Sequence, residues 1–224
     1  GSSTHVLRLQ PNSVALSETT ETLALANEDG LHVANLDSTE SLSIDPRPAI
    51  LKPHFDAVGY LWSVAAEGGV NVYKDGQLTV LLEQNPETRI DYALSPEGSR
   101  LAEIVLIDDV SKLQIRGVIR DSDGKPRALT DPLPVRSARP ELVSWLGESQ
   151  LALVERSVTD STILSVSSLK GETEDAVTPP VTIEGLTTVG NSIYVISPLR
   201  EVWSRFGNSW RSLVSDELSL NTAR

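Results

Sequence analysis

The sequence of 224 residues contains no cysteine and no methionine, and only 4% of its residues are aromatic. Without cysteine, these residues cannot form disulfides, zinc–thiolate sites, iron–sulfur clusters or a thiol nucleophile. No apolar run approaches the roughly 20 residues that a membrane-spanning helix needs. Basic residues are also few, with 19 Lys and Arg against 31 Asp and Glu, a net charge of −12. This balance argues against nucleic acid and against anionic membrane surfaces as the main partner.

The missing methionine indicates that the chain is an excised fragment of a longer protein. We interpret residues 1–3, which begin Gly1-Ser2, as the remnant of an expression tag. Residues 4–224 are expected to form one domain, because the repeats described next would share a single core.

A repeated pattern is the most informative feature of the sequence. Ala15-Leu16-Ser17, a polar turn and Leu23-Ala24 are followed at identical spacing by Ala93-Leu94-Ser95, a turn and Leu101-Ala102. Looser copies give five apolar anchors that lie 38, 40, 50 and 42 residues apart, namely Leu23, Leu61, Leu101, Leu151 and Ile193. This spacing is typical of a four-stranded propeller blade.

Each repeat continues with short strands rich in Val, Ile, Leu and Thr, separated by turns such as Asp29-Gly30 and Asp75-Gly76. No segment shows an apolar stripe of 3.6-residue period, and prolines gather between the repeats, where we expect connections. The sequence therefore predicts an all-β fold, a β-propeller of five four-stranded antiparallel blades. An incomplete six-bladed propeller is the alternative. The outer strand of the last blade is expected from His5 to Gln10 or, alternatively, from Trp210 to Val214.

No motif points to a catalytic, cofactor-binding or metal-binding residue. The three histidines, His5, His32 and His54, lack metal-ligand spacing. Asp121-Ser122-Asp123-Gly124 resembles the start of a calcium loop, but the twelfth position is Pro132, so a hairpin turn is favoured. Gly147-Glu148-Ser149-Gln150-Leu151 fails as a nucleophile elbow at its last position.

Two carboxylates and one aromatic cluster remain as candidate sites. Asp91 lies four residues before Ser95, and Glu141 lies four residues before Trp145 at the corresponding position of the next repeat. The two carboxylates could therefore meet at the channel mouth and serve acid–base chemistry. Strand starts at a wet rim are the favoured interpretation. A possible partner-facing cluster lies late in the chain, since Trp and Arg are enriched at binding hot spots: Trp203, Arg205, Trp210 and Arg211.

The order of several segments resembles the carboxy-terminal β-propeller of the actinobacterial lipoprotein family LpqB. The segments are Ala93 to Ala102, Val118 to Asp121, Ala128-Leu129-Thr130-Asp131-Pro132, Leu142 to Leu146, Leu151 to Val154, and the final repeat from Ile193 to Trp203. The resemblance covers roughly residues 13 to 210 and fits the first two repeats less well.

The resemblance implies a non-enzymatic, extracytoplasmic interaction domain. In that family a lipid-modified cysteine anchors the full protein to the outer face of the cell membrane, and a separate amino-terminal domain precedes the propeller. The family's partner is thought to be the extracytoplasmic sensor region of a histidine kinase, through which it affects cell-wall homeostasis and division. The LpqB family has no catalytic residues, so the resemblance assigns none to this sequence. Two alternatives stay open: a ligand binder or hydrolase acting on cell-wall glycans through Asp91 and Glu141, and a spacer that supports the missing amino-terminal domain.

Overall fold

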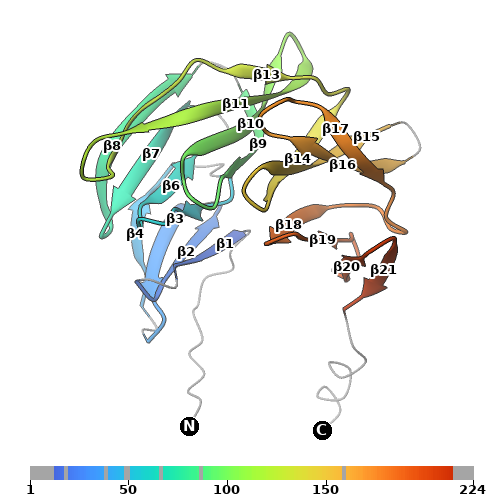
Figure 1. The fold of residues 1–224 in the computed structure, drawn as a ribbon. Helices are drawn as coiled ribbons and strands as arrows, with labels where there is room; N and C mark the ends of the chain where they lie inside the picture. The colour runs from blue at the N-terminus through green and yellow to red at the C-terminus, as the bar shows by residue number, and fades with distance from the viewer. Residues whose placement is uncertain are drawn as a thin grey trace, which may run out of the picture. The chain divides into compact units, whose positions relative to one another are not determined.

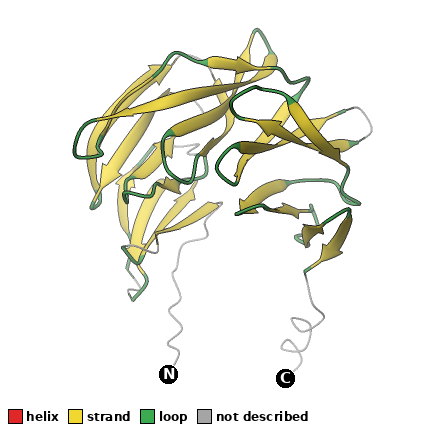
Figure 2. Ribbon diagram, in the orientation of Figure 1, coloured by secondary structure: helices red, strands yellow, loops and turns green. Residues whose placement is uncertain are grey.

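The computed structural model describes residues 13–17, 20–37, 40–47, 51–65, 68–85, 88–157 and 160–213 as strands and turns (Figure 1). The chain divides into two compact units, residues 1–134 and residues 135–224. Figure 2 shows strands joined by loops. The described residues contain no helix, and so none that is long and apolar enough to cross a membrane.

Five antiparallel sheets follow one another along the chain, and each is built from four consecutive strands in simple up-and-down order. The fold is a five-bladed β-propeller, which confirms the fold class that the repeats predict. We number the blades 1 to 5 in chain order; blades 1 to 3 lie in the first unit and blades 4 and 5 in the second.

The strands of blades 1 and 2 are β1 (Ser13–Ser17), β2 (Thr22–Asn27), β3 (Gly30–Asn35), β4 (Leu42–Asp45), β5 (His54–Phe55), β6 (Leu61–Val64), β7 (Gly68–Lys74) and β8 (Gln77–Asn85). Blade 3 and its extra strand contain β9 (Thr88–Leu94), β10 (Arg100–Ile107), β11 (Val110–Arg120), β12 (Pro126–Leu129) and β13 (Leu133–Val135). Blades 4 and 5 contain β14 (Pro140–Leu146), β15 (Gln150–Arg156), β16 (Ser161–Ser167), β17 (Thr173–Val177), β18 (Gly185–Val189), β19 (Ser192–Ile196), β20 (Val202–Phe206) and β21 (Ser209–Ser212).

Blade 3 departs from the expected pattern by one strand. The long strand β11 pairs with β12 through Val118 to Arg120, and the short strand β13 also pairs with β11. Pro134 therefore lies inside a strand, where we expected a connection between blades. A proline is tolerated there because β13 is a short segment at the margin of the sheet.

The outer strand of blade 5 comes from the end of the described chain. Strand β21 pairs with β20 from Trp203↔Ser212 to Phe206↔Ser209, which agrees with the expected strand at Trp210. The other expected segment, His5 to Gln10, lies outside the described residues.

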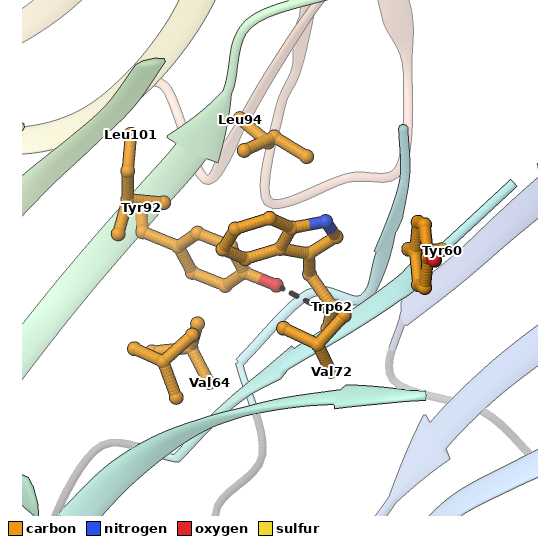
Figure 3. Close-up of a cluster of buried hydrophobic side chains, with 8 residues drawn as sticks. Tyr60, Trp62, Val64, Val72, Tyr92, Leu94 and Leu101 are labelled. Atoms are coloured by element: carbon orange, nitrogen blue, oxygen red, sulfur yellow. Dashed lines mark hydrogen bonds between the residues drawn. The ribbon is translucent and has the colours of Figure 1, made fainter. Parts of the chain in front are cut away.

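Apolar side chains fill the space between neighbouring blades within each unit. In the cluster drawn in Figure 3, Trp62 and Val72 of blade 2 meet Tyr92 and Leu101 of blade 3, and the Tyr92 hydroxyl donates to the Trp62 carbonyl at 3.4 Å. A second cluster joins blades 1 and 2, and a third joins blades 4 and 5. Burial of both faces explains why the central strands read as nearly continuous apolar runs.

The third cluster yields a stability prediction. Ile163 of β16 is 1% exposed in this cluster, whereas Leu169 in the following turn is 75% exposed. Ile163→Ala is expected to lower the free energy of unfolding by about 2–5 kcal/mol, because it leaves a cavity. The matched control Leu169→Ala is expected to stay within about 0.5 kcal/mol of the parent protein. Urea unfolding measures both, and equal losses would contradict the assigned core.

Candidate functional site

Two hairpin turns share one aspartate-centred geometry. In the β5–β6 turn, Asp56 N–H donates to the Tyr60 carbonyl at 3.0 Å, and Asp56 Oδ1 accepts from the amides of Val58 and Tyr60 at 3.0 and 2.8 Å. In the β11–β12 turn, Asp121 makes the same bonds, with its Oδ1 accepting from the amides of Asp123 and Lys125 at 3.0 and 2.9 Å. Each aspartate thus supplies the acceptors that a tight turn needs.

The Asp121 turn is a hairpin turn, as the sequence favours over a calcium loop. Besides the two amides that Oδ1 accepts from, Arg127 donates to Asp121 Oδ2 at 2.8 Å. Among the described residues, no group of three or more His, Asp and Glu side chains is arranged to hold a metal ion.

The second oxygen of Asp56 forms an ion pair between blades. Asp56 Oδ2 accepts from the Trp62 indole at 3.0 Å and from the Arg120 guanidinium at 2.7 Å. The same guanidinium donates to the carbonyls of Gly98 and Gly124, both at 2.7 Å. Arg120 therefore ties together three turns of blades 2 and 3. A Cβ at Gly98, where φ is +72°, would lie 2.7 Å from the guanidinium, so glycine is required there.

A second buried carboxylate joins blades 1 and 2. Asp45, the last residue of β4, accepts from Arg47 at 2.6 Å and from the Ser63 hydroxyl of β6 at 2.9 Å. Burial alone would raise the pKa of Asp45, but hydrogen bonds from Arg47, Ser63 and Tyr73 outweigh it and lower the pKa to about 2. The carboxylate of Asp45 stays ionised and fixes the end of blade 1 against blade 2.

A third carboxylate lies inside blade 3. Glu103 of β10 and Arg89 of β9 are both fully buried, and Arg89 Nε donates to Glu103 at 2.7 Å. Gln114 of β11 donates to the other Glu103 oxygen at 2.8 Å, and Arg116 lies 3.4 Å from it. The charge of Glu103 is therefore compensated from both neighbouring strands, as a buried ion requires.

The channel-mouth candidates Asp91 and Glu141 are each held by a cation of their own unit. Asp91, in β9, is 5% exposed, and its Oδ2 accepts from Lys52 Nζ at 2.9 Å. Glu141, in β14, is partly exposed and forms an ion pair with Arg156 at 2.9 Å. These contacts give each carboxylate a structural role, and nothing in them favours paired-carboxylate chemistry. A meeting of the two at a channel mouth stays a prediction.

His54, the first residue of β5, lies against Tyr92 of blade 3. Its ring meets the Tyr92 ring edge-on, with centroids 5.0 Å apart, and its Nε2 is buried without a hydrogen-bond partner among the described residues. Burial and, to a smaller extent, the charge of Lys52 lower the pKa of His54 to about 3, against a smaller opposing effect of a backbone hydrogen bond with Tyr92. The His54 side chain is partly buried, and its lowered pKa leaves it uncharged at neutral pH.

The predicted aromatic cluster is divided between the two faces of blade 5. Trp203 and Trp210 pack against the apolar cluster between blades 4 and 5, and the strand register places Arg205 opposite Trp210. Arg205 also donates to Asp175 of β17 at 2.8 Å. Side chains alternate along a strand, so Arg211 lies on the other face, where its guanidinium is 5.1 Å from the Phe206 ring. These residues do not form one continuous patch, and their contact with a partner stays a prediction.

A pocket that the sequence analysis did not anticipate lies between blades 1 and 2. Its volume is about 600 Å³, and it opens to solvent. Turns and strand ends from both blades enclose it, including Thr20 and Glu40 of blade 1 and Phe55, Gly59 and Asp75 of blade 2. The repeat pattern could have located these turns at one end of each blade, but the width of the gap between them depends on tertiary packing.

Comparison with known proteins supports the fold and does not assign a family. No protein-family model and no curated protein sequence matches the chain. Among solved structures, hydrazine synthase from Kuenenia stuttgartiensis is similar, with a TM-score of 0.65, 12% identity, and coverage of 94% of this chain and 68% of that one. The WD40 β-propeller domain of Doa1 is also similar, with a TM-score of 0.62, 13% identity, and coverage of 92% and 68%. At such identities the likeness shows the β-propeller fold alone.

The two aspartate-centred turns allow a matched stability test. Asp56→Ala is expected to lower the free energy of unfolding by about 3–5 kcal/mol, because it leaves the half-buried Arg120 guanidinium without its counter-ion and the buried Trp62 indole without an acceptor. Asp121→Ala removes the same turn bonds but only a solvent-exposed ion pair, so a clearly smaller loss is expected. Urea unfolding of both variants compares them. A loss at Asp121 as large as that at Asp56 would show that the turn, and not the ion pair, carries the energy.

The neutral His54 predicts a pH dependence. An unfolded histidine takes up a proton near pH 6.5, whereas the pKa of His54 in the folded protein is about 3. The unfolded state then binds more protons between these values, so stability is expected to fall as pH drops from about 6.5 toward 3. His54→Phe keeps an aromatic ring against Tyr92 and should make this slope shallower. Unfolding free energies measured from pH 7 to pH 4 test this, and identical slopes for the parent and the variant would refute it.

Proposed function

We propose that the chain is a non-enzymatic, extracytoplasmic protein-interaction domain of a lipoprotein that modulates a sensor histidine kinase and, through it, cell-wall homeostasis and division. The propeller fold supports the general part of this proposal, a role in binding another protein. The resemblance of the segment order from Ala93 to Trp203 to the LpqB family supports the finer role, including the lipid anchor and the kinase partner.

The observation that carries the interaction role is how the protein uses its buried charges. Four carboxylates are buried among the described residues, and each pairs with a cation: Asp45 with Arg47, Asp56 with Arg120, Asp91 with Lys52, and Glu103 with Arg89. Active sites usually hold carboxylates whose environment tunes them for proton transfer. Here the buried carboxylates hold strands and blades in register, which suits a rigid scaffold for surface loops.

Rigidity and charge both favour binding to a protein partner. A scaffold whose blades are joined by ion pairs loses little conformational entropy when its loops bind a partner. The net charge of −12 steers association toward a basic surface, an effect that salt weakens. Blade 5 supplies one candidate surface, where Phe206 is 50% exposed beside Arg211.

Binding to isolated extracytoplasmic sensor regions of histidine kinases from the source organism tests this proposal. We expect one sensor region to bind the chain at tens of micromolar or tighter, roughly −6 kcal/mol or better. Phe206→Ala and Arg211→Ala are expected to weaken this binding severalfold, and Arg127→Ala, which breaks an exposed Arg–Asp pair in blade 3, should not.

Thermal unfolding of each variant shows whether the fold is intact. The absence of binding to every sensor region at these concentrations would overturn the kinase-modulating role. Equal weakening by Arg127→Ala and by the two blade 5 variants would leave the role in place and remove blade 5 as the contact surface.

A further inference from the structure

Blade 1 differs from the rest of the chain in its charge. Residues 9–46, which include all four of its strands, contain seven Asp and Glu residues and no Lys or Arg. The chain as a whole has 19 Lys and Arg in 224 residues, so this stretch is distinctly acidic. The only histidine in it is His32, in β3.

The turns at one end of blades 1 and 2 form the walls of the pocket between these blades. The β1–β2 turn and the β3–β4 connection lie side by side, since Leu36 N–H donates to the Glu21 carbonyl at 2.9 Å. Across the pocket lie the β5–β6 turn at Gly59 and the β7–β8 turn at Asp75-Gly76. The pocket is therefore a groove of about 600 Å³ between two blades of the same unit.

The groove combines an apolar floor with an acidic rim. Val33, Leu42, Phe55, Leu61 and Tyr73 contribute apolar surface, and Leu42 is 61% exposed. Among the residues that the structure describes, the two charged side chains that line the groove are acidic and exposed: Glu40 and Asp75.

Two further groups border the groove. Lys74 keeps its positive charge beside Gly59, because the partners of its ammonium are neutral: the Val58 carbonyl at 2.7 Å and the Tyr60 ring, whose centre is 4.9 Å away. The two carboxylates outnumber this one ammonium. The Tyr73 ring lines the groove, while its hydroxyl accepts from Asn71 at 3.1 Å. Tyr73 is thereby fixed to the polar network of Asp45, which keeps this wall of the groove in place.

We propose that the groove between blades 1 and 2 binds a segment of a partner protein in which Lys or Arg side chains alternate with apolar ones. The cations pair with Glu40 and Asp75, and an apolar side chain packs against Leu42 and Phe55. Charge complementarity selects this occupant, since an acidic rim repels acidic segments and gives a neutral ligand no advantage. The inference rests on the proposed role as an interaction domain and adds to it the chemistry of the partner.

A fluorescent peptide of alternating lysine and leucine is the probe. Fluorescence anisotropy should show saturable binding that weakens as salt rises, and no binding of the glutamate–leucine counterpart. Amide shifts in NMR spectra should move at Thr20, Gly59 and Gly76. Absence of binding, shifts confined to other blades, or preferred binding of a neutral oligosaccharide would each overturn the proposal.

Matched variants separate the groove from the general acidity of the chain. The double variant Glu40→Gln, Asp75→Asn removes two charges, and asparagine tolerates the φ of +51° at position 75. It is expected to weaken peptide binding about tenfold. The control Asp123→Asn, Asp131→Asn changes the net charge equally at exposed positions of blade 3 and its following turn, and should stay within about twofold. Equal losses of affinity would mean that peptide binding depends only on the net charge of the chain, and would overturn the proposal that the groove is the binding site.

An apolar variant and the sensor-region assay complete the test. Leu42→Ala should weaken the peptide severalfold without changing its salt dependence, and no effect would remove the apolar part of the proposal. If a sensor region binds and Glu40→Gln, Asp75→Asn does not weaken it, the groove fails while the kinase role stands. If the peptide binds in the groove and no sensor region binds, the kinase role fails while the groove stands.

Discussion

The ion pair between Asp56 and Arg120 holds blade 2 against blade 3 and ties together turns of both blades. Arg120 Nη2 lies 2.7 Å from Asp56 Oδ2, and the Asp56 side chain is fully buried. Arg120 also reaches the carbonyls of Gly98 and Gly124, so one guanidinium fixes three turns. Its planar fork of donors suits this task better than a lysine ammonium would.

The same principle recurs at the other joints of the first unit. Asp45 with Arg47 and Ser63 joins blade 1 to blade 2, and Lys52 with Asp91 ties the segment before β5 to blade 3. Apolar clusters such as that of Trp62 and Tyr92 supply non-directional burial energy, whereas the ion pairs fix how one blade aligns with the next. A buried charge that lost its partner would cost several kcal/mol, so sliding of the blades is opposed. This rigidity links the packing to the proposed role, because loops on a fixed frame bind at a low entropic cost.

Much of the fold could be predicted from the sequence. The repeated Ala-Leu-Ser and Leu-Ala segments predict the first two strands of each blade, because a second strand buried on both faces, such as β2 or β10, leaves an apolar signature. Turn residues such as Asp121 and Gly124 predict the hairpins, because their preference for turns is a property of the residues themselves. Strand β13 was missed because Leu133-Pro134-Val135 has no pattern of its own, and it pairs only because β11 is long enough to accept it.

The candidate sites were harder to predict, because they depend on contacts distant in sequence. Asp56 and Arg120 are 64 residues apart, and no local pattern connects them. Trp203, Arg205, Trp210 and Arg211 are close in sequence, but the alternation of side chains along a strand places Arg211 on the opposite face. The acidic stretch from residue 9 to residue 46 is visible in the sequence, whereas the groove that makes use of it appears only once the turns of two blades are brought together.

A double-mutant cycle on Asp56 and Arg120 tests the central claim most directly. The unfolding free energies of Asp56→Ala, Arg120→Ala and the double variant give the coupling between the two side chains. If the ion pair locks blade 2 to blade 3, the coupling should be about 2 kcal/mol or more, and the double variant should lose much less than the sum of the single losses. Additive losses, with a coupling near zero, would contradict the account.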